Sequence, residues 1–568
     1  MIDIRNIRWE RKKQAILQYL RENPVVHKGL TVVSALGINY KHAGFFALIP
    51  ENLDLEAHIQ HYPLTNYKFV DTDSGIRPVN MNGTLGLRYD IERMYHIISL
   101  ITSARADSKD EIGESGFVPI HSRRIRHYFK DYLSYLDYLI VTGIIICDRQ
   151  YIVDERPREY KLAPEYENVL LIPHYYTCFN PISVNPIEEL VYNEENNSFE
   201  RNALLDKEYL SWWYKQKKID IHPFAEKYSK NVWKSKIGIN DSDHSKWDIS
   251  DKWDVEKHCY PRKDPKLQYN AVTQNINEIK IHHYKAKIDA NVHRLSSVLT
   301  NIQSEYRNYM TYDGQELVAI DIKNSQPYLL CLLLNKEFWM ENSALPININ
   351  NLSPNIQRLY KTPPEILSTI QGFFELVNIT EFQEYINLVA SGMLYEIIIE
   401  IAKQIRKSTK LNRKKAKKNL LTFFYSANKD DIEGVSRRTY IIEKVFREKF
   451  PTIMRLIRLI KNNYEGTAIN NTYNRFSRLL QSVESEIVLN RCCKRIWDEG
   501  HHKVPIFTIH DSIATTYEYQ DYVKRIMEDE LTKAVGVKPT LKIETWHISN
   551  LDKYPFPKFP AVIYITDN

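Results

Sequence analysis

The chain has 568 residues, of which 26% are charged and 43% are apolar, and these proportions exclude a generally disordered chain and a small cross-linked scaffold. Its formal net charge of +6 is too small to identify a partner, because basic residues matter through their clustering. The 38 tyrosines and nine tryptophans beside 77 Lys and Arg suit single-stranded nucleic acid, and they suit ordinary amphipathic packing equally well.

The cysteines and the N-terminus indicate the compartment. Six cysteines show no Cys-x-x-Cys spacing, which predicts a reduced chain without structural zinc. The opening MIDIRNIRWERKKQ lacks the apolar segment of a signal peptide, and no run approaches the ~18 uninterrupted apolar residues of a membrane span. We therefore expect a cytoplasmic protein with no membrane partner.

Residues 1–115 match no module, and the first clear pattern follows them. The stretch VPIHSRRIRHYFKDYLSYLDYLIVTG predicts one or two helices that start near an N-cap at Ser122 and stop at Gly143. The segments IIIC, YIV and EYKL then predict a β-hairpin, and helices followed by a hairpin are typical of winged helix-turn-helix modules. We interpret residues 116–190 as such a module.

A group of basic residues near the start of this module would give it a surface for DNA phosphates. The residues proposed for this contact are Arg123, Arg124, Arg126 and Lys130, with His127 among them. The alternative interpretation is a basic helix that is simply solvated.

Residues 191–285 are rich in charge, Asn and Trp, as in INDSDHSKWDISDKWDVEKHCYPRKDP, and show weak periodicity. This composition predicts a polar connector or surface insertion, and we place a domain boundary there. Residues 286–550 then form the next domain, and residues 551–568, which contain YPFPKFP, form an extended tail.

Within that domain, QELVAIDI at 315–322 predicts a buried strand, and QPYLLCLLLNKEFW after it predicts a helix. Asp321 lies at the end of the apolar run. Because an unpaired buried charge is costly, this carboxylate must face a cation, hold a metal or cap the next element.

A second carboxylate follows a similar run far along the chain. The stretch VPIFTIHDSIATTYEY predicts two strands folded about His510 and Asp511, a placement that suits a metal ligand. Two carboxylates on neighbouring strands could hold a pair of Mg²⁺ ions about 3.5–4 Å apart. The spacing in the sequence does not by itself show that Asp321 and Asp511 meet.

The segment NRKKAKKNLLTFFYS predicts a helix with an unusual face. At 100° per residue, Arg413, Lys417 and Tyr425 fall within an arc of roughly 120° along about 18 Å of helix. Two cations in that register could bind successive phosphates of a nucleoside triphosphate, and an aromatic ring at the helix end could stack on a base. The alternative is a lysine-rich helix that faces solvent.

Order and register join these pieces. Asp-x-x-x-Ser-Gln at 321–326, Arg-x3-Lys-x7-Tyr at 413–425, Gln481 in LLQSVESEIVLN and His-Asp-Ser at 510–512 resemble the polymerase core shared by family A DNA polymerases and phage-type single-subunit RNA polymerases. The resemblance covers roughly residues 285–550 and leaves the N-terminal half unmatched.

The resemblance implies an α+β right-hand fold with a palm, fingers and thumb-like helices, preceded by the winged-helix-like module. It implies that Asp321 and Asp511 bind two Mg²⁺ ions, with Mn²⁺ as an alternative ion. By the same likeness Arg413 and Lys417 contact the incoming triphosphate, Lys417 protonates the leaving pyrophosphate, and Tyr425 guards the sugar and base of the nucleotide.

Other positions carry over with departures. Gln481 matches a glutamine that touches the primer-template duplex, and His510 would lie near the primer end. Gln326 occupies the position where similar DNA polymerases have a glutamate that blocks the 2′-hydroxyl, so it could obstruct the ribose or bind its hydroxyl. Ser426 replaces the glycine that usually follows the fingers tyrosine, which puts the local helix end in doubt.

The resemblance therefore predicts a template-directed polymerase that adds nucleotides to a 3′-hydroxyl, with DNA synthesis slightly favoured, in the replication of a phage or mobile element. Its expected partners are primer-template nucleic acid and nucleoside triphosphates. The first alternative is a DNA-directed RNA polymerase of the single-subunit type. Two further alternatives are an inactive polymerase-like replication initiator or regulator and a metal-dependent nuclease.

Overall fold

A computed structural model describes the chain between residues 45 and 553, with gaps. The described ranges are 45–62, 67–72, 75–80, 91–107, 116–122, 125–126, 132–148, 158–167, 169–176, 187–193, 198–237, 244–249, 262–361, 365–377, 379–407, 411–425, 437–461 and 474–553.

A six-stranded antiparallel sheet lies in the largest hydrophobic core. Its strands are β10 (Ile219–Ile221), β13 (Met310–Tyr312), β14 (Gln315–Ile322), β16 (Ser512–Thr516), β15 (Phe507–Ile509) and β17 (Leu541–Thr545). Strand β14 is central, since it pairs with β13, β16 and β17. The fold therefore combines helices with an antiparallel sheet, as the α+β prediction requires at that coarse level.

Strand β14 is the element that the sequence predicted most directly. Val318, Ala319 and Ile320 are all buried, and helix α21 (Gln520–Val535) packs against β14 and β16. A strand that is covered on both faces has a continuous apolar run instead of an alternating one. The observed bounds of β14 are those of the predicted strand, 315–322.

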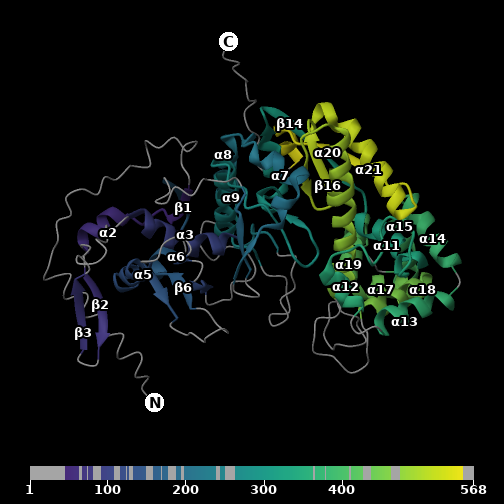
Figure 1. Cartoon of the computed structure of the whole chain (residues 1–568), viewed down its shortest axis with the longest axis horizontal. Coiled ribbons are helices and arrows are strands. Elements are labelled where there is room, and N and C mark those ends of the chain that lie inside the picture. Colours follow the sequence, from purple (N-terminus) through teal and green to yellow (C-terminus); the bar gives the residue numbers. More distant parts are fainter. Residues whose placement is uncertain are drawn as a thin grey trace, which may run out of the picture.

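Helices make up most of the rest of the C-terminal half. They are α11 (Ser325–Leu333), α12 (Pro354–Lys361), α13 (Glu365–Glu375), α14 (Thr380–Ala390), α15 (Leu394–Ile405), α16 (Arg413–Tyr425), α17 (Arg437–Lys449), α18 (Pro451–Lys461), α19 (Asn474–Ser485), a π-helical segment (Glu486–Cys493) and α20 (Lys494–Glu499). Helices α12 to α18 gather at the end of the molecule opposite the N-terminal elements (Figure 1).

Aromatic side chains and one buried amine hold the C-terminal end of α16. Phe423 packs on Phe446 with ring centroids 5.4 Å apart, and Phe424 packs on Phe476 at 5.3 Å. Lys461, which is 1% exposed, donates from Nζ to the carbonyl oxygen of Phe423 at 2.6 Å. Burial lowers the pKa of Lys461 to about 7. This amine satisfies a carbonyl that the last turn of a helix leaves without an internal partner.

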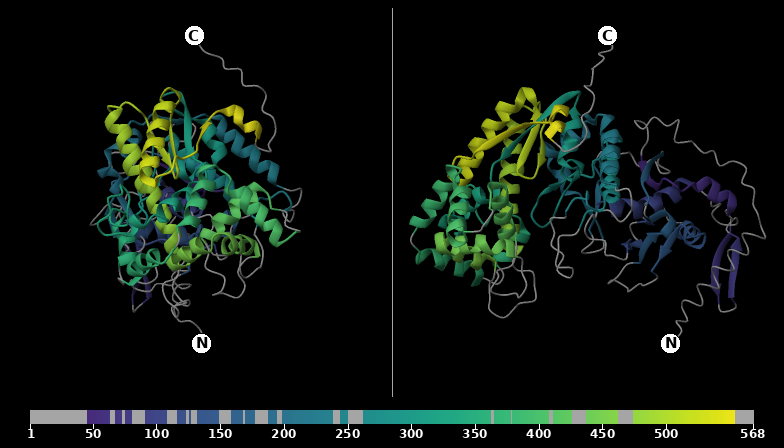
Figure 2. Two further views of the ribbon diagram at one scale, coloured as in Figure 1. Left: turned by 90° about the vertical axis from the view of Figure 1, so that its right-hand side faces the viewer. Right: turned by 180° about the vertical axis from the view of Figure 1, so that it is seen from behind.

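The N-terminal elements have a core of their own. They are β1 (Phe45–Pro50), α2 (Leu55–His61), β2 (Tyr67–Thr72), β3 (Gly75–Asn80), α3 (Ile91–Asp107), β4 (Val118–Pro119), α5 (Tyr132–Val141), β5 (Ile145–Cys147), β6 (Glu159–Leu162), α6 (Pro164–Glu167) and β7 (Leu171–Tyr176). Seen from behind, they lie at the far side of the molecule from α20 and α21 (Figure 2).

Within 118–162 the structure describes helix α5 and the strands β5 and β6, which fall in the predicted IIIC and EYKL segments, whereas the predicted YIV segment lies outside the described residues. Helix α5 ends just before Gly143, which has a φ of +85° and so adopts the backbone conformation that glycine permits at a helix end. Strands β5 and β6 pair antiparallel, with Ile145 opposite Leu162, and β4 adds to β6. A winged-helix identity for this module remains a prediction.

The proposed DNA-contact residues fall mostly outside the description. Arg123, Arg124, Lys130 and His127 lie outside the described residues, whereas Arg126 is described and exposed. Helix α5 itself, YLSYLDYLIV, contains no Lys or Arg. The DNA-binding role of this basic group therefore stays a prediction.

The prediction of a polar connector over 191–285 was wrong for the described part of that range. It contains η2 (Ala203–Asp206), α7 (Glu208–Lys215), α8 (Phe224–Lys236) and α9 (Pro265–Lys280), together with β10 and the short hairpin β8 (Leu190–Asn193) and β9 (Ser198–Arg201). Trp213, Tyr214 and Ile276 from these elements belong to the main core. Helix α9 also buries Asn, Gln and Glu side chains, which hid its periodicity from the sequence.

The smaller elements between α9 and β14 are β11 (Lys287–Ile288), β12 (Leu295–Ser296), α10 (Val298–Asn301) and the 3-10 helix η3 (Ser304–Tyr309). Within the described ranges, no single helix has the length and apolar character needed to cross a bilayer. Helices α14 and α15 meet that test only as a pair, and they are joined at a bend of 114°.

Candidate active site

Asp321 and Asp511 lie side by side at one edge of the central sheet, where strand β14 ends and strand β16 begins. Asp321 is directly opposite Ser512 in the β14–β16 register, and the backbone N–H of Ile322 donates to the carbonyl oxygen of Asp511 at 3.3 Å. Since Ile509 pairs with Ser512, only His510 and Asp511 form the turn. Two carboxylates 190 positions apart in the sequence are thus brought together by β14 and by the turn that precedes its neighbour β16.

The turn that carries Asp511 is tight. His510 has a φ of +54°, in the left-handed region that two-residue hairpin loops use. The hydroxyl of Ser512 donates to the carbonyl oxygen of Ile509 at 3.0 Å and closes the turn. The surrounding protein and the Arg294 guanidinium lower the pKa of His510, so its imidazole favours the neutral form.

The two carboxylates interact electrostatically with each other and with a lysine. Burial, followed by the charge of Asp511, raises the pKa of Asp321 to about 6, and the Lys417 ammonium opposes that rise. A carboxyl beside a second negative charge ionises less readily, and a cation bound between Asp321 and Asp511 would relieve the repulsion that Asp321 experiences.

One face of α16 points toward this edge. Lys417, Leu421 and Tyr425 line a cavity of about 220 Å³ together with Asp511. The other residues that line it are Arg294, Asn324, Ser325, Gln326, Pro327, Tyr395, Glu484 and His510. The structure thus places Lys417, Tyr425 and Gln326 around one hollow next to the carboxylate edge.

Arg413 does not line this cavity. Its guanidinium forms an ion pair with Glu396 of α15 and lies 5.4 Å from the centroid of the Tyr395 ring. It also donates to the carbonyl oxygen of Gly392 at 3.3 Å. Arg413 is thus held against α15, one helical turn before Lys417 on α16.

Gln481 and Tyr425 are partners. The two side chains are hydrogen-bonded, and burial, with the negative charge of Glu484, raises the pKa of the Tyr425 phenol to about 12. Gln481 is thus placed beside the aromatic ring at the end of α16. Its contact with a primer-template duplex remains a prediction.

The sequence did not predict a buried ion pair at the back of the cavity. Glu484, on α19, is 2% exposed, and its Oε1 lies 2.5 Å from Nη2 of Arg294. Its Oε2 accepts a hydrogen bond from Nε2 of Gln326 at 2.8 Å. Burial, followed by the charge of Asp511, raises the pKa of Glu484 to about 7, while Arg294 opposes the rise.

Asp289 fixes the hairpin that delivers Arg294. The Asp289 carboxylate accepts from the backbone N–H groups of Asn291 at 2.9 Å, Val292 at 3.0 Å and Arg294 at 2.8 Å. Strands β11 and β12 flank this turn, with Ile288 opposite Leu295. These three hydrogen bonds to one carboxylate hold the turn in one conformation, and the turn in that conformation sets the direction of the Arg294 side chain.

The sequence analysis identified neither Arg294 nor Glu484 as a site residue, and only Glu484 has a local sequence pattern that could have indicated it. Glu484 comes three positions after Gln481 among the apolar residues of a helix, and an acid at a core position requires a partner. Nothing in the local sequence distinguishes Arg294 from a solvent-facing arginine.

The donor set suits magnesium. Among the described residues, no group of three or more His, Cys, Asp and Glu side chains could hold one metal ion. Mg²⁺ is commonly bound by one or two carboxylates with substrate phosphates and waters completing the coordination. Asp321 and Asp511 provide two such carboxylates, so the residues fit an ion that is shared with a phosphorylated substrate.

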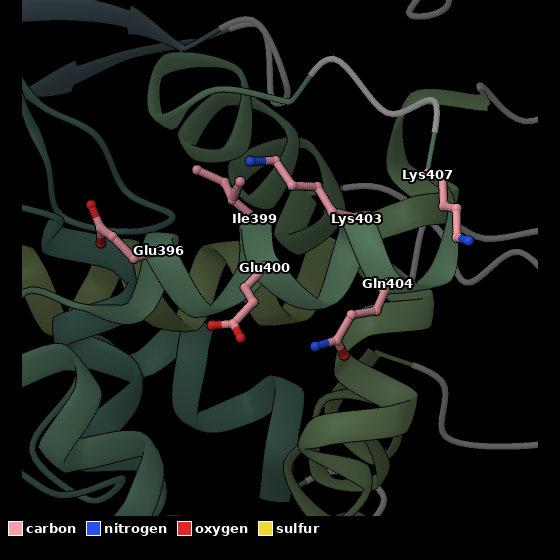
Figure 3. Close-up of a pocket in the computed structure, with 6 residues that line it drawn as sticks. All are labelled: Glu396, Ile399, Glu400, Lys403, Gln404 and Lys407. Carbon is pink, nitrogen blue, oxygen red and sulfur yellow. The ribbon is translucent and has the colours of Figure 1, made fainter.

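A larger hollow of about 560 Å³ lies along helix α15. It is lined by Glu396, Ile399, Glu400, Lys403, Gln404 and Lys407. These side chains fan out along α15 and the residues just after it, and they do not converge on a point (Figure 3). The smaller cavity, by contrast, is lined by residues from six separate segments, with the Asp511 carboxylate among them.

No family model and no curated protein matches the chain. Among solved structures, it is similar to the POL domain of Pol1 from M. smegmatis in a complex with DNA primer-template and dNTP. The identity is 11%, the TM-score is 0.34, and the match covers 61% of this chain and 70% of that chain. Because a TM-score of this size does not establish a shared fold, we draw no function from the likeness.

Proposed function

We propose that this protein is a nucleotidyltransferase that uses divalent metal. The observation that carries the proposal is the pairing of Asp321 and Asp511 at one sheet edge, with Lys417 close enough to shift the pKa of Asp321. A pair of carboxylates that faces a cationic helix suits a substrate with a metal-bound triphosphate.

More particularly, we propose a template-directed nucleic-acid polymerase. The motifs at 321–326, 413–425, 481 and 510–512 resemble such enzymes in order and register, and the cavity beside the carboxylates is lined by residues of three of these motifs. In this proposal, the 3′-oxygen of a primer bonds to the α-phosphorus of a nucleoside triphosphate, and the bond from that phosphorus to pyrophosphate breaks.

Each group in the site has a role in this reaction. Two Mg²⁺ ions, bound by Asp321 and Asp511 together with nucleotide phosphates, would stabilise the attacking and leaving oxygens. Lys417 binds the triphosphate and supplies a proton to the departing pyrophosphate, while the proton of the 3′-hydroxyl passes to solvent. Tyr425 closes the sugar and base side of the cavity.

A primer-extension assay with Mg²⁺ tests this function. We expect wild type to extend a primer, Asp511→Asn to lose extension, and Lys417→Ala to extend about 100-fold more slowly or worse. Lys414→Ala is the matched control, because Lys414 is exposed on the same helix and does not line the cavity. Equal extension by wild type and Asp511→Asn would refute the metal assignment.

The same variants separate the rival functions. A nuclease has no need of a lysine for a triphosphate, so Lys417→Ala would then leave cleavage intact while wild type fails to extend any primer. An inactive initiator or regulator would bind DNA without incorporation or cleavage.

A further inference from the structure

Lys461 is a buried amine that no step of the proposed reaction uses. It is the last residue of helix α18 and is 1% exposed. Lysine is almost never fully buried unless it is paired, and burial lowers the pKa of this one to about 7. A methionine of similar length would fill the same volume without that cost. Packing alone therefore does not explain an amine at this position.

The amine contacts two helices, α16 and α19. Its Nζ donates to the carbonyl oxygen of Phe423 at 2.6 Å and lies 4.8 Å from the centroid of the Phe423 ring on α16. The same atom lies 6.0 Å from the centroid of the Phe476 ring on α19. Phe476 in turn packs on Phe424, with ring centroids 5.3 Å apart. Lys461 thus lies at the junction where the end of α16 meets the start of α19.

These two helices also carry a pair of side chains beside the cavity. Tyr425, which lines the cavity, follows Phe423 by two residues at the end of α16. Gln481 lies on α19, five residues after Phe476, and its side chain is hydrogen-bonded to that of Tyr425. A change in the spacing of the two helices at their junction would therefore displace Tyr425 relative to Gln481.

The other end of α18 is fixed as well. The carboxylate of Glu381, on α14, accepts from the backbone N–H groups of Thr452 at 3.1 Å and Ile453 at 2.8 Å. The first N–H groups of a helix have no partner within it, and a negative charge there is favourable. Helix α18 is therefore anchored on α14 at its first turn and presents Lys461 to α16 at its last residue.

The contact does not depend on the charge of the amine. Glu443, on α17, raises the pKa of Lys461, whereas Arg458, on α18, lowers it. An ammonium and a neutral amine both carry N–H groups, so either form can donate to the carbonyl oxygen of Phe423. The hydrogen bond is thus available whether or not Lys461 is protonated.

We propose that Lys461 is a positioning residue for nucleotide binding, which holds the end of α16 against α19 so that Tyr425 closes the sugar and base side of the cavity. This inference rests on the proposed polymerase function. Lys417 lies about two turns earlier on α16. The start of that helix is held on α15 by the ion pair of Arg413 with Glu396, so the position of Lys417 does not depend on Lys461.

Single-nucleotide addition to a primed template, measured over a range of nucleotide concentrations, tests the proposal. Lys461→Met removes the donor and keeps the length of the side chain. It should raise the KM for the nucleotide about 10-fold, the effect of one lost hydrogen bond. The kcat should change by less than about threefold, because Lys417 stays in place.

Two further variants control this measurement. Lys461→Gln keeps an N–H donor on an uncharged side chain, so its KM should lie between those of the wild type and Lys461→Met. Arg455→Met is the matched control on the same helix, because Arg455 is exposed and its guanidinium lies 5.6 Å from the centroid of the Phe373 ring on α13. Its KM should equal that of the wild type.

A double-mutant cycle distinguishes positioning from a general loss of structure. In a Tyr425→Ala background, Lys461→Met should have no further effect on KM, because the side chain that it positions is gone. Destabilisation alone would lower the fraction of active protein, and hence kcat, by the same factor in both backgrounds. An equal increase in KM in both backgrounds would overturn the proposal.

Hydrogen–deuterium exchange provides a readout that does not depend on activity. The backbone amides of Phe424 and Tyr425 should exchange about 10-fold faster in Lys461→Met than in the wild type, whereas the amide of Lys417 should be unchanged. Unchanged exchange at the end of α16 would contradict the proposed role.

The outcomes separate this inference from the proposed function. If the wild type adds no nucleotide, the polymerase proposal fails, and this inference fails with it. If the wild type adds nucleotides and Lys461→Met has the same KM, this inference alone fails and the polymerase proposal stands.

Discussion

Arg294 and Glu484, 190 positions apart in the sequence, form a buried ion pair with an Nη2–Oε1 distance of 2.5 Å. The pair joins the β11–β12 hairpin to helix α19 at the back of the cavity. It also orients Gln326 through the second oxygen of Glu484. The side chain of Arg294 is 25% exposed and that of Glu484 is 2% exposed. If the pair separated, water could solvate the arginine, whereas the glutamate would remain buried without its partner.

Removing Arg294 should therefore destabilise the fold. We expect Arg294→Ala to lower the free energy of unfolding by about 1–3 kcal/mol, because the buried Glu484 carboxyl loses its hydrogen-bonding partner. Urea denaturation measures this loss. In a Glu484→Leu background the same substitution should cost much less, and equal costs in both backgrounds would contradict a coupled pair.

Magnesium binding should depend on pH. The pKa of Asp321 is raised to about 6 by burial and by Asp511, and a metal competes with the proton on that carboxyl. We expect the dissociation constant for Mg²⁺ to rise about tenfold for each pH unit below about 6, measured by calorimetry. Asp511→Asn should lower the pKa of Asp321 measured by titration without metal, and an unchanged pKa in that variant would count against the coupling.

Without metal, the contribution of Asp321 to the stability of the fold should decrease as the pH rises, whereas the affinity for Mg²⁺ should increase. The folded pKa of Asp321 lies above its unperturbed value of 3.8, so the folded state binds more protons between pH 3.8 and about 6. The stability that this carboxyl contributes is present below that window and is lost as the pH rises through it. Added Mg²⁺ should consequently raise the melting temperature more at pH ~7.5 than at pH ~5.

Arg413 and Lys417 should differ in their effect on nucleotide use. Lys417 lines the cavity, whereas Arg413 pairs with Glu396 and lies over Tyr395. We expect Lys417→Ala to reduce kcat/KM for nucleotides about 100-fold or more, and Arg413→Ala to reduce it by less than about tenfold. Steady-state kinetics decide this, and a larger loss for Arg413→Ala would show that its pairing with Glu396 opens when nucleotide binds.

Lys461 should give the protein a distinctive response to alkaline pH. Its pKa is lowered by burial to about 7 from 10.5, so between these values the unfolded state binds more protons. The contribution of this lysine to stability therefore grows as pH rises through that window. The difference in unfolding free energy between wild type and Lys461→Met should increase by up to about 1.4 kcal/mol per pH unit. Lys403→Met, at an exposed position on α15, should show no such trend.

Some features of the fold could be predicted from short stretches of sequence. The apolar run 315–322 predicted β14, the two runs around His510 and Asp511 predicted β15 and β16, and the steps from Arg413 to Tyr425 predicted α16. Periodicity and turn residues are local, so a stretch of about ten residues contains them. The elements within residues 191–285 could not be predicted in this way, because their buried positions are spread over short elements and a polar helix.

By itself, the sequence determined which residue types are available for chemistry: two aspartates at strand ends, a lysine and a tyrosine on one helix face, and a glutamine near a helix start. Only the tertiary structure decided that Asp321 meets Asp511, that Arg413 is held away from the cavity, and that Arg294 and Glu484 orient Gln326. The physical reason is that charge pairing and hydrogen bonding act over a few ångströms, and the residues concerned are as many as 190 positions apart.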